Sequence, residues 1–233
     1  MDWLVSEVDE DDFLEIKNTS LGKLVRDQIL SQILSGVFAP GQAIRESELV
    51  DQLKVSRVPV REALRELESS GLVVSRKHSG VYVRELSESE ERDLYYFRAV
   101  LDSHAGRMAA QLTTEKRHQL VKSLEESTVA MDIAIKEKDP QAYYRENLLF
   151  HWHFIQYLEN KEIAKVYREL IQKLHLSRLK NLSSVGYRER SNAEHKQIVE
   201  SLSDANIKKQ DKCCSVLLDH HVRSAYDRLR SIE

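Results

Sequence analysis

The order of patterns between residues 20 and 84 constrains the fold more than any other feature of this chain. Three helical stretches come first, and two short strand patterns follow them. Over residues 21–33 apolar side chains recur at helical spacing, and Gly36 ends that stretch in a turn. A second, shorter helix is expected through residues 48–53.

The third helix of this segment is expected to begin after Ser56, a residue type that favours the N-cap position. Pro59 falls in the first turn, where its missing N–H leaves no hydrogen bond unmade, and Gly71 ends the helix. Residues 72–75 and 81–83 have the pattern of two short strands joined by a hairpin. Three helices followed by a β-hairpin predict a winged helix-turn-helix.

Past residue 86 the apolar spacing is helical to the end of the chain, and 7 glycines and 3 prolines in 233 residues provide few helix breakers. Patterns typical of helix starts stand at Ser87–Glu90, Asp139–Pro140 and Ser191–Glu194. Periodicity predicts six helices, at about 88–112, 114–137, 140–158, 160–181, 191–203 and 206–231. The predicted fold class is therefore mainly α, with an N-terminal winged helix-turn-helix followed by an all-α helical-bundle effector domain.

The charges are unevenly distributed along the chain, although the formal net charge is only −3. Residues 1–19 hold seven acidic residues and one lysine, whereas residues 20–85 hold ten basic and eight acidic residues. We therefore expect an acidic N-terminal arm over 1–19, a DNA-binding domain over 20–85, and a helical ligand-binding and dimerisation domain over 86–233.

Composition also indicates where the protein works. The chain has no apolar run near the roughly 18–20 residues that a membrane span needs, and Met1–Leu4 do not begin a signal peptide. The two cysteines, Cys213 and Cys214, are adjacent and cannot build a disulfide framework. A cytoplasmic protein without membrane contact is expected.

Three arginines of the third helix lie on one face. Arg57, Arg61 and Arg65 recur every four residues, opposite the apolar face. Such a face can enter the major groove of DNA, where arginine makes a bidentate contact to guanine, and Ser56 at the helix start suits a phosphate. The alternative is a solvated face in which the arginines pair with nearby glutamates.

The same segment resembles the DNA-binding domain of the GntR superfamily. The resemblance rests on Pro40-Gly41, Glu48-Leu49, Val55-Ser56-Arg57, Pro59 to Leu64, Leu67, Gly71-Leu72-Val73 and Gly80 to Val83. It implies a homodimer that binds a palindromic operator in double-stranded DNA. The residues that it places in or beside the major groove are Ser56, Arg57, Val58, Pro59 and Arg61.

The resemblance further implies that the wing around His78 and Gly80 lies at the minor groove. Some relatives carry a DNA-contacting arginine where this chain has Ser47, and Arg45 is the residue that could substitute for it.

Histidines of the second domain suggest a metal site. His151 follows Asn147 by four residues, so both project from one helical face, while His195 and the pair His220 and His221 belong to later helices. Three imidazoles from three helices could bind a divalent metal, with further coordination positions left for water or ligand. The alternative is that each histidine is an ordinary core or surface residue.

Residues 94–228 resemble the FCD effector domain of the FadR subfamily of GntR regulators. The matching motifs are Arg98-x-x-Leu101-Asp102, Asn147-x-x-Phe150-His151, Glu194-His195-x-x-Ile198 and a late histidine before Val222. The resemblance implies a divalent metal, zinc or nickel among the candidates, that holds a small carboxylate. The implied ligands are Asn147, His151, His195 and His221.

Two departures from the family pattern affect this site. Neutral Asn147 stands where a carboxylate is usual, which weakens binding of a divalent ion, and His220 remains an alternative to His221. Arg98, Tyr144 and Arg145 are candidate partners for the effector's carboxylate.

These observations predict a transcription regulator, most simply a repressor, whose operator binding is modulated by a small organic acid. One alternative is a regulator that responds to the metal itself, and another is a purely structural metal site. A metal-dependent enzyme is disfavoured, because the chain has no HExxH motif, no nucleophile elbow and no phosphate-binding loop. We therefore expect no enzymatic activity.

Overall fold

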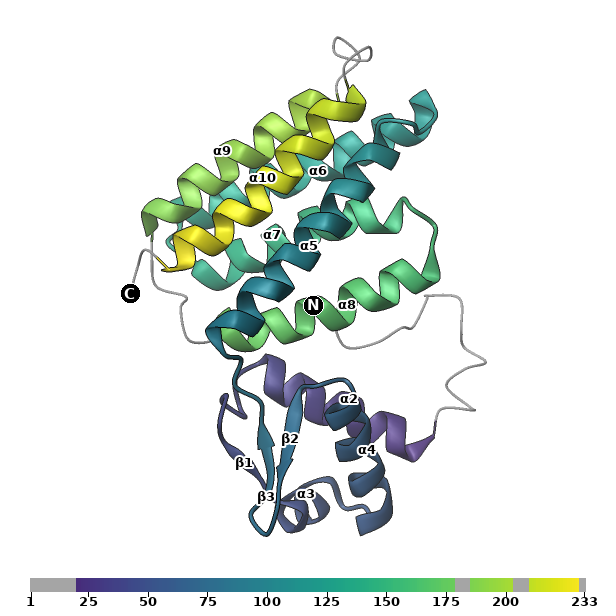
Figure 1. The fold of residues 1–233 in the computed structure, drawn as a ribbon, viewed down its shortest axis with the longest axis vertical. Helices are drawn as coiled ribbons and strands as arrows, with labels where there is room; N and C mark the ends of the chain where they lie inside the picture. The colour runs from purple at the N-terminus through teal and green to yellow at the C-terminus, as the bar shows by residue number, and fades with distance from the viewer. Residues whose placement is uncertain (1–19, 179–184, 203–209, 231–233) are drawn as a thin grey trace. The chain divides into compact units, whose positions relative to one another are not determined.

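A computed structural model describes residues 20–178, 185–202 and 210–230, which form two compact units (Figure 1). Of the described residues, the first unit comprises 20–87 together with 168–178, and the second comprises 88–167 together with 185–202 and 210–230. The acidic arm predicted over 1–19 lies outside the described residues. None of the helices within the described ranges combines the length and apolar character that a membrane span requires.

The first unit is a winged helix-turn-helix, as the sequence predicts. Its elements in chain order are α2 (Leu21–Leu34), β1 (Ala43–Ile44), α3 (Glu46–Leu53), α4 (Arg57–Ser69), β2 (Val73–Arg76) and β3 (Gly80–Val83). The three strands form an antiparallel sheet in the order β1-β3-β2. Strand β1 was not predicted, because two residues are too short to show an alternating pattern.

Local chemistry sets the helix boundaries of this unit. The Ser20 hydroxyl accepts a hydrogen bond from the Lys23 backbone N–H at 3.1 Å and caps α2. Lys54 has a left-handed backbone, with φ of 54°, and makes the tight turn between α3 and α4. Apolar side chains from all three helices and the strands fill the core, among them Ile29, Ile33, Leu49, Val60, Leu67 and Val83.

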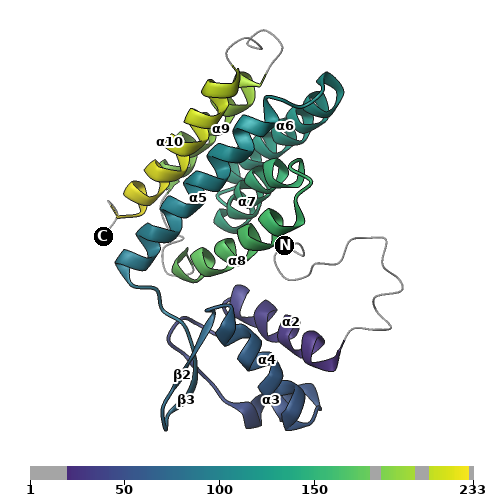
Figure 2. The same ribbon diagram turned by 45° about the vertical axis from the view of Figure 1, so that its right-hand side comes forward.

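The second unit is helical throughout its described residues. Its elements are α5 (Glu88–Ala109), α6 (Thr114–Lys136), α7 (Pro140–Gln156), α8 (Lys161–Arg178, of which the second half belongs to the first unit), α9 (Val185–Ser201) and α10 (Gln210–Arg230). Helix α5 packs on α10 and α7, and α6 packs on α7 and α9 (Figure 2). Helix α9 also packs along α10.

One predicted helix start is wrong. The sequence places it at Ser191, but α9 begins at Val185, so Ser191 and Asn192 lie inside the helix and are buried. The amide of Asn192 donates to the Thr128 carbonyl at 3.0 Å and to Asp132 at 2.8 Å. These contacts to α6 satisfy a polar side chain that the sequence pattern alone assigns to a cap.

Candidate functional site

The start of helix α4 presents the residues that the sequence assigns to DNA. Val58 is 63% exposed, while Val60 is fully buried on the opposite face and anchors the helix in the core. Arg57 is exposed and makes no ion pair with any described residue. Arg61 is exposed as well, and its Nε donates to Glu46 of α3 at 2.8 Å.

Two residues predicted to contact DNA, Pro59 and Arg45, already contact other parts of the protein. Pro59 is buried, so its side chain supports the first turn of α4 rather than the exposed face. Arg45 pairs with Glu48 at 3.1 Å, and both side chains are largely exposed. Ser56 is the N-cap of α4 with an extended backbone, and its hydroxyl makes no capping hydrogen bond, which leaves it available to an external group.

The wing is a hairpin between β2 and β3 with an unusual backbone. His78 has φ of 61° and Gly80 has φ of 107°, and both are exposed. The Tyr82 hydroxyl lies 2.5 Å from the Ser79 hydroxyl, and the Arg76 guanidinium stacks 4.3 Å above the Tyr82 ring. These contacts hold the hairpin tip in one shape and keep His78 at the surface.

The structure brings His151 of α7, His195 of α9 and His221 of α10 together in the interior of the bundle. One ligand atom from each of the three lies within 4.8 Å of the others. The Nε2 atoms of His151 and His195 are 3.4 Å apart, and each of the three residues is at most 3% exposed. Asn147 lies one helical turn before His151, with its amide nitrogen 3.3 Å from Nε2 of His195.

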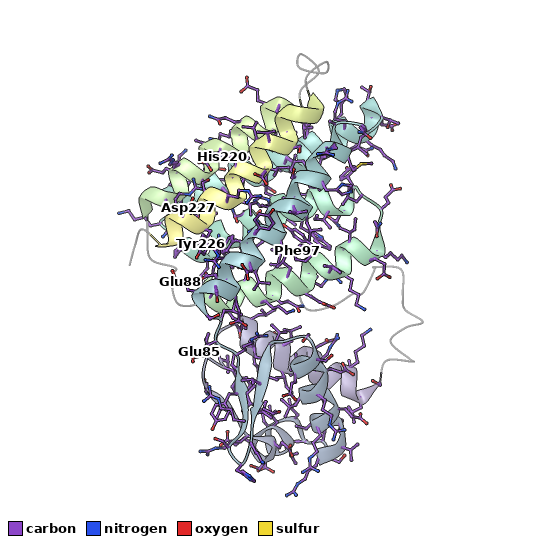
Figure 3. The ribbon with its side chains drawn as sticks, in the orientation of Figure 1. Glu85, Glu88, Phe97, His220, Tyr226 and Asp227 are labelled. Carbon is purple, nitrogen blue, oxygen red and sulfur yellow. The ribbon has the colours of Figure 1, made fainter. Side chains whose placement is uncertain are left out.

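His220, the alternative to His221, is exposed on α10 and carries the label in Figure 3. His221 is the residue whose side chain points into the bundle.

A carboxylate stands behind His151. Oδ1 of Asp102, on α5, lies 3.4 Å from Nδ1 of His151, which is long for a hydrogen bond, and Nδ1 of His151 has no hydrogen-bond partner among the described residues. Asp102 also accepts from Arg98 Nε at 3.2 Å and from the Tyr167 hydroxyl at 3.0 Å. Arg98 and Tyr167 therefore hold the Asp102 carboxylate in place beside the His151 ring.

A second carboxylate stands behind His221. Glu194 Oε2 lies 2.8 Å from Nδ1 of His221, and Glu194 also accepts two hydrogen bonds from Arg228, at 2.6 and 3.0 Å. An imidazole that donates through Nδ1 has its Nε2 lone pair directed away from that partner. The Glu194 contact therefore leaves Nε2 of His221 to face a metal, and Nε2 of His151 lies 3.4 Å from that of His195 at the same place.

Burial keeps these imidazoles neutral. It lowers the pKa of His151 to about 4, although Asp102 partly opposes the effect. Burial and the neighbouring His221 hold the pKa of His195 well below its ordinary value, and burial also lowers the pKa of His221. Burial raises the pKa of Glu194, but the hydrogen bonds from His221 and Arg228 outweigh it and bring that pKa to about 2. Neutral rings beside ionised carboxylates are the protonation states that metal binding requires.

The donor set fits a divalent transition metal. Imidazole nitrogens bound tetrahedrally at zinc distances are about 3.3 Å apart, close to the separation of the His151 and His195 Nε2 atoms. Nδ1 of His195 is buried and has no hydrogen-bond partner among the described residues. Asn147 contributes an oxygen to such a site only after its amide turns by half a rotation, because its nitrogen now faces His195.

Sequence reasoning missed the two carboxylates as contributors to this site. Asp102 and Glu194 both stand in the motifs that carry the family resemblance, yet their partners lie on other helices. Their distance from the histidines along the chain hides the contacts, which only the packing of the bundle creates. Arg98, which the sequence predicts as an effector contact, is 3% exposed and forms an ion pair with Asp102.

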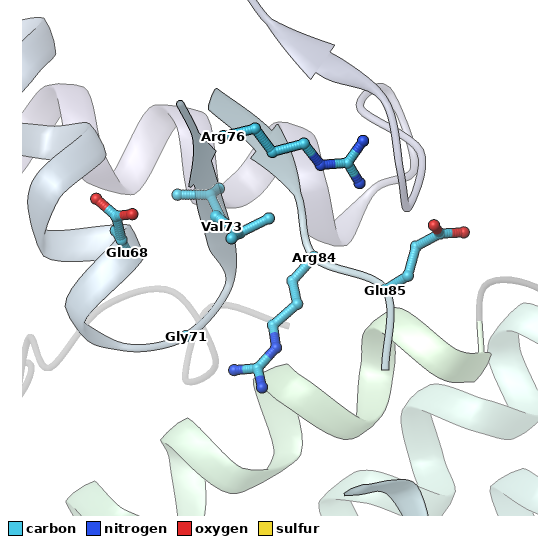
Figure 4. Close-up of a pocket in the computed structure, with 7 residues that line it drawn as sticks. Glu68, Gly71, Val73, Arg76, Arg84 and Glu85 are labelled. Atoms are coloured by element: carbon cyan, nitrogen blue, oxygen red, sulfur yellow. The ribbon is translucent and has the colours of Figure 1, made fainter. Parts of the chain in front are cut away.

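A separate surface hollow of about 430 Å³ lies in the first unit (Figure 4). Its lining residues are Glu68, Gly71, Val73, Val74, Arg76, Arg84 and Glu85. Glu68 accepts from the Ser75 backbone N–H at 2.9 Å. Because both signs of charge line this open hollow, it does not favour one class of ligand.

A winged helix-turn-helix joined in one chain to a helical bundle defines a class of protein, the two-domain type of DNA-binding regulator. Residues 21–83 match the family described as "Bacterial regulatory proteins, gntR family", and residues 93–220 match the FCD domain. The chain therefore belongs to the GntR family of bacterial regulatory proteins and carries an FCD effector domain, in agreement with the predicted FadR-like membership.

Named relatives agree with this assignment. The chain is 30% identical to the Nta operon transcriptional regulator of Aminobacter aminovorans, over 84% of this chain and 88% of that protein. It is 32% identical to the "Probable D-xylose utilization operon transcriptional repressor" of Paenarthrobacter nicotinovorans, over 66% of this chain and 67% of that protein.

Solved structures share the fold. A GntR-type transcriptional regulator of Rhodococcus sp. RHA1 superposes with a TM-score of 0.77 at 19% identity, over 92% of this chain and all of that one. Because the matching family and the named relatives are transcription regulators, the chain is a transcriptional regulator, and the metalloenzyme alternative is not retained.

Proposed function

We propose that this GntR-family regulator represses transcription by binding a palindromic operator as a homodimer, and that a small organic acid modulates that binding. A divalent metal held by the histidines of the bundle would bind the acid. The observation that carries this proposal is the convergence of three buried, neutral imidazoles within 4.8 Å of one another, two of them backed by carboxylates.

Helix α4 supplies the sequence-reading half of the proposal. Arg57 and Val58 are exposed at its N-terminal end, where residues of a recognition helix reach base edges in the major groove. Arg61 would exchange its contact with Glu46 for a base or a phosphate. The Arg61–Glu46 ion pair is exposed, so breaking it costs little free energy. Ser56 would bind phosphate, and His78 and Gly80 of the wing would approach the minor groove. Pro59 is buried and serves as support for the helix start.

Residues of α7, α9 and α10 would form the metal centre. His151, His195 and His221 would supply nitrogen ligands, and Asn147 a neutral oxygen. When bound, the metal supplies a positive centre for a carboxylate oxygen of the effector. Glu194 holds the His221 ring in place and Asp102 lies beside the His151 ring, while Arg98 lies close enough to Asp102 to add positive charge at the same end of the site.

Regulation would follow from a shift between two arrangements of the domains. An acid that binds one arrangement more tightly than the other changes its population, and only one arrangement spaces two recognition helices to match both half-sites. Because each histidine is at most 3% exposed, loading of the site requires the surrounding helices to open.

Metal titration tests the centre directly. Protein stripped with a chelator would be titrated with zinc and with nickel by calorimetry, alongside His195→Ala. We expect one equivalent to bind per chain and binding to weaken at least a hundred-fold in the variant. Equal affinity in both proteins would show that the metal lies elsewhere.

A regulator that responds to the metal alone is the second candidate, and the buried state of the cluster favours it. Gel shifts distinguish the acid-responsive regulator from the metal-responsive one. The operator would be selected from a random duplex pool, and its binding would be measured with metal alone and with metal plus acetate, lactate, malate or gluconate. Operator release by metal without any acid would support the metal-responsive reading.

A further inference from the structure

Helix α9 buries an arginine that has no acidic partner among the described residues. Arg98, Arg117 and Arg188 are the described arginines that are at most 6% exposed. Arg98 pairs with Asp102 at 3.2 Å, and Arg117 donates to the Leu112 carbonyl at 3.2 Å. Arg188 is 6% exposed and makes no ion pair or side-chain hydrogen bond with any described residue. Because an isolated charge is costly to remove from water, a buried arginine of this kind indicates that the protein binds an anion there.

The carboxylates nearest to Arg188 along the chain do not neutralise it. Glu189 is exposed on α9. Glu194 accepts two hydrogen bonds from Arg228, at 2.6 and 3.0 Å, and belongs to the support of the metal site. Residues 179–184, which precede α9, contain no aspartate or glutamate. A carboxylate that binds at Arg188 would therefore balance a charge that its neighbours in the sequence leave unbalanced.

Arg188 lies on the same face of α9 as His195 of the metal site. The two residues are seven apart, which is two helical turns, so they differ by about 20° in direction and by about 10 Å along the axis. Ser191 lies between them, one turn before His195. Ser191 is fully buried, and its hydroxyl has no hydrogen-bond partner among the described residues. This face of α9 therefore carries a guanidinium, a hydroxyl and a metal ligand in that order.

This stretch of α9 suits a molecule with two carboxylates. A divalent ion at His195 would be one positive centre, and Arg188 is the other. Of the roughly 10 Å between the two residues along the axis, a metal–oxygen bond of about 2 Å and a guanidinium–oxygen hydrogen bond of about 2.8 Å take up half. One small molecule with a carboxylate at each end bridges the remainder, whereas a monocarboxylate such as acetate reaches only one of the two charges.

We infer that the effector of this protein is a small dicarboxylate, and that Arg188 binds the carboxylate farther from the metal. Arginine suits this role because its planar guanidinium pairs with a carboxylate through two parallel hydrogen bonds. The buried hydroxyl of Ser191 would donate a hydrogen bond to the same ligand. The inference rests on the proposed function, since the metal site anchors the first carboxylate, and it adds the class of acid and the residue that selects it.

The melting temperature of acid-free protein tests whether the charge of Arg188 lacks a partner. Arg188→Met removes the charge and keeps most of the side chain's volume, so we expect the melting temperature to rise. Arg117→Met removes a buried arginine whose hydrogen bond is in place, and as the matched control it should lower the melting temperature. A lower melting temperature for Arg188→Met as well would show that the guanidinium is paired within the protein and would overturn the inference.

Calorimetric titration with acids of graded length tests the class of ligand. The full chain loaded with zinc would be titrated with acetate, malonate, succinate, glutarate and adipate. We expect at least one dicarboxylate to bind about ten-fold or more tightly than acetate, and Arg188→Met to remove this preference while acetate affinity stays within about three-fold. Arg188→Lys keeps the charge without the paired geometry and should recover part of the preference. Arg145→Met on α7, where the native side chain is 53% exposed, is the control and should keep all of it.

The outcomes separate this inference from the proposed function. Equal affinity for acetate and for every dicarboxylate, or an equal loss for both in Arg188→Met, would overturn the dicarboxylate assignment and leave an acid-responsive regulator standing. A protein that binds zinc but none of these acids would count against the acid-responsive regulator itself, and the inference would be lost with it.

Discussion

Glu194 shows how a single residue acts on the metal site through another. It holds Nδ1 of His221 at 2.8 Å and is itself held by two hydrogen bonds from Arg228. Removing the charge weakens the orientation and basicity of the imidazole without emptying the space. We expect Glu194→Gln to lower metal affinity about 10- to 100-fold by calorimetry.

Glu189→Gln is the matched control, since Glu189 lies on the same helix and is exposed. Unchanged metal affinity in Glu194→Gln would refute an orienting role for this carboxylate.

Asn147 places a neutral amide beside the three histidines of the candidate site. A carboxylate there would add negative charge beside the metal, so we expect Asn147→Asp to raise metal affinity at least ten-fold. In metal-free protein the same change buries a carboxylate at a position that is 3% exposed, so its melting temperature should fall. Thermal melts with chelator and with metal measure both effects, and a shift of the same sign in both conditions would place Asn147 outside the site.

Arg57 is the side chain on which the DNA-reading proposal depends most. An arginine that reads guanine contributes about 1–3 kcal/mol of discrimination, so Arg57→Ala should weaken operator binding about 10- to 100-fold. Lys165→Ala removes one exposed positive charge from α8 and is the control. Gel shifts that show equal loss for both variants would reduce the role of Arg57 to general charge.

At the scale of elements, Gly106 sets how closely α5 and α10 approach. A Cβ added there would stand 2.5 Å from Leu218 Cδ1 and 3.3 Å from Cys214 Sγ. The two helices would have to separate, and we expect Gly106→Ala to destabilise the protein by about 1–3 kcal/mol in urea unfolding.

Gly22 of α2, unlike Gly106, has room for a larger side chain. Its added Cβ would meet the carboxylate end of Glu62, which can move aside. Gly22→Ala should therefore be neutral or stabilising by up to about 1 kcal/mol. Destabilisation of equal size at both positions would indicate that close helix packing is not what Gly106 provides.

The elements also show what a sequence alone predicts. The winged unit and the helices of the bundle follow from periodicity, because burial of one face leaves a regular spacing of apolar residues. Strand β1 and the start of α9 do not follow, since the first is too short for a pattern and the second is decided by the contacts of Asn192 with α6.

The candidate site likewise contains residues that the sequence predicts and residues that it does not. The sequence motifs predict the three histidines as ligands, and the structure brings them together. Asp102, Tyr167 and Glu194 could not be assigned, because their roles depend on helices that are distant in sequence.

At the scale of the whole molecule, a buried histidine cluster lies in one unit and the DNA-binding helix lies in the other. The GntR and FCD matches establish the two parts and their order in the chain. The coupling between them is the proposal, and it requires that the acid bind the metal-loaded cluster and bias the dimer.

The most direct test of this coupling is operator affinity measured by fluorescence anisotropy in four conditions: metal-free or metal-loaded protein, each with and without the acid that gives the largest thermal shift. We predict that the acid lowers operator affinity about 5- to 150-fold in the metal-loaded protein only, and that His195→Ala loses the effect. An acid response of equal size in metal-free protein, or in His195→Ala, would contradict the account.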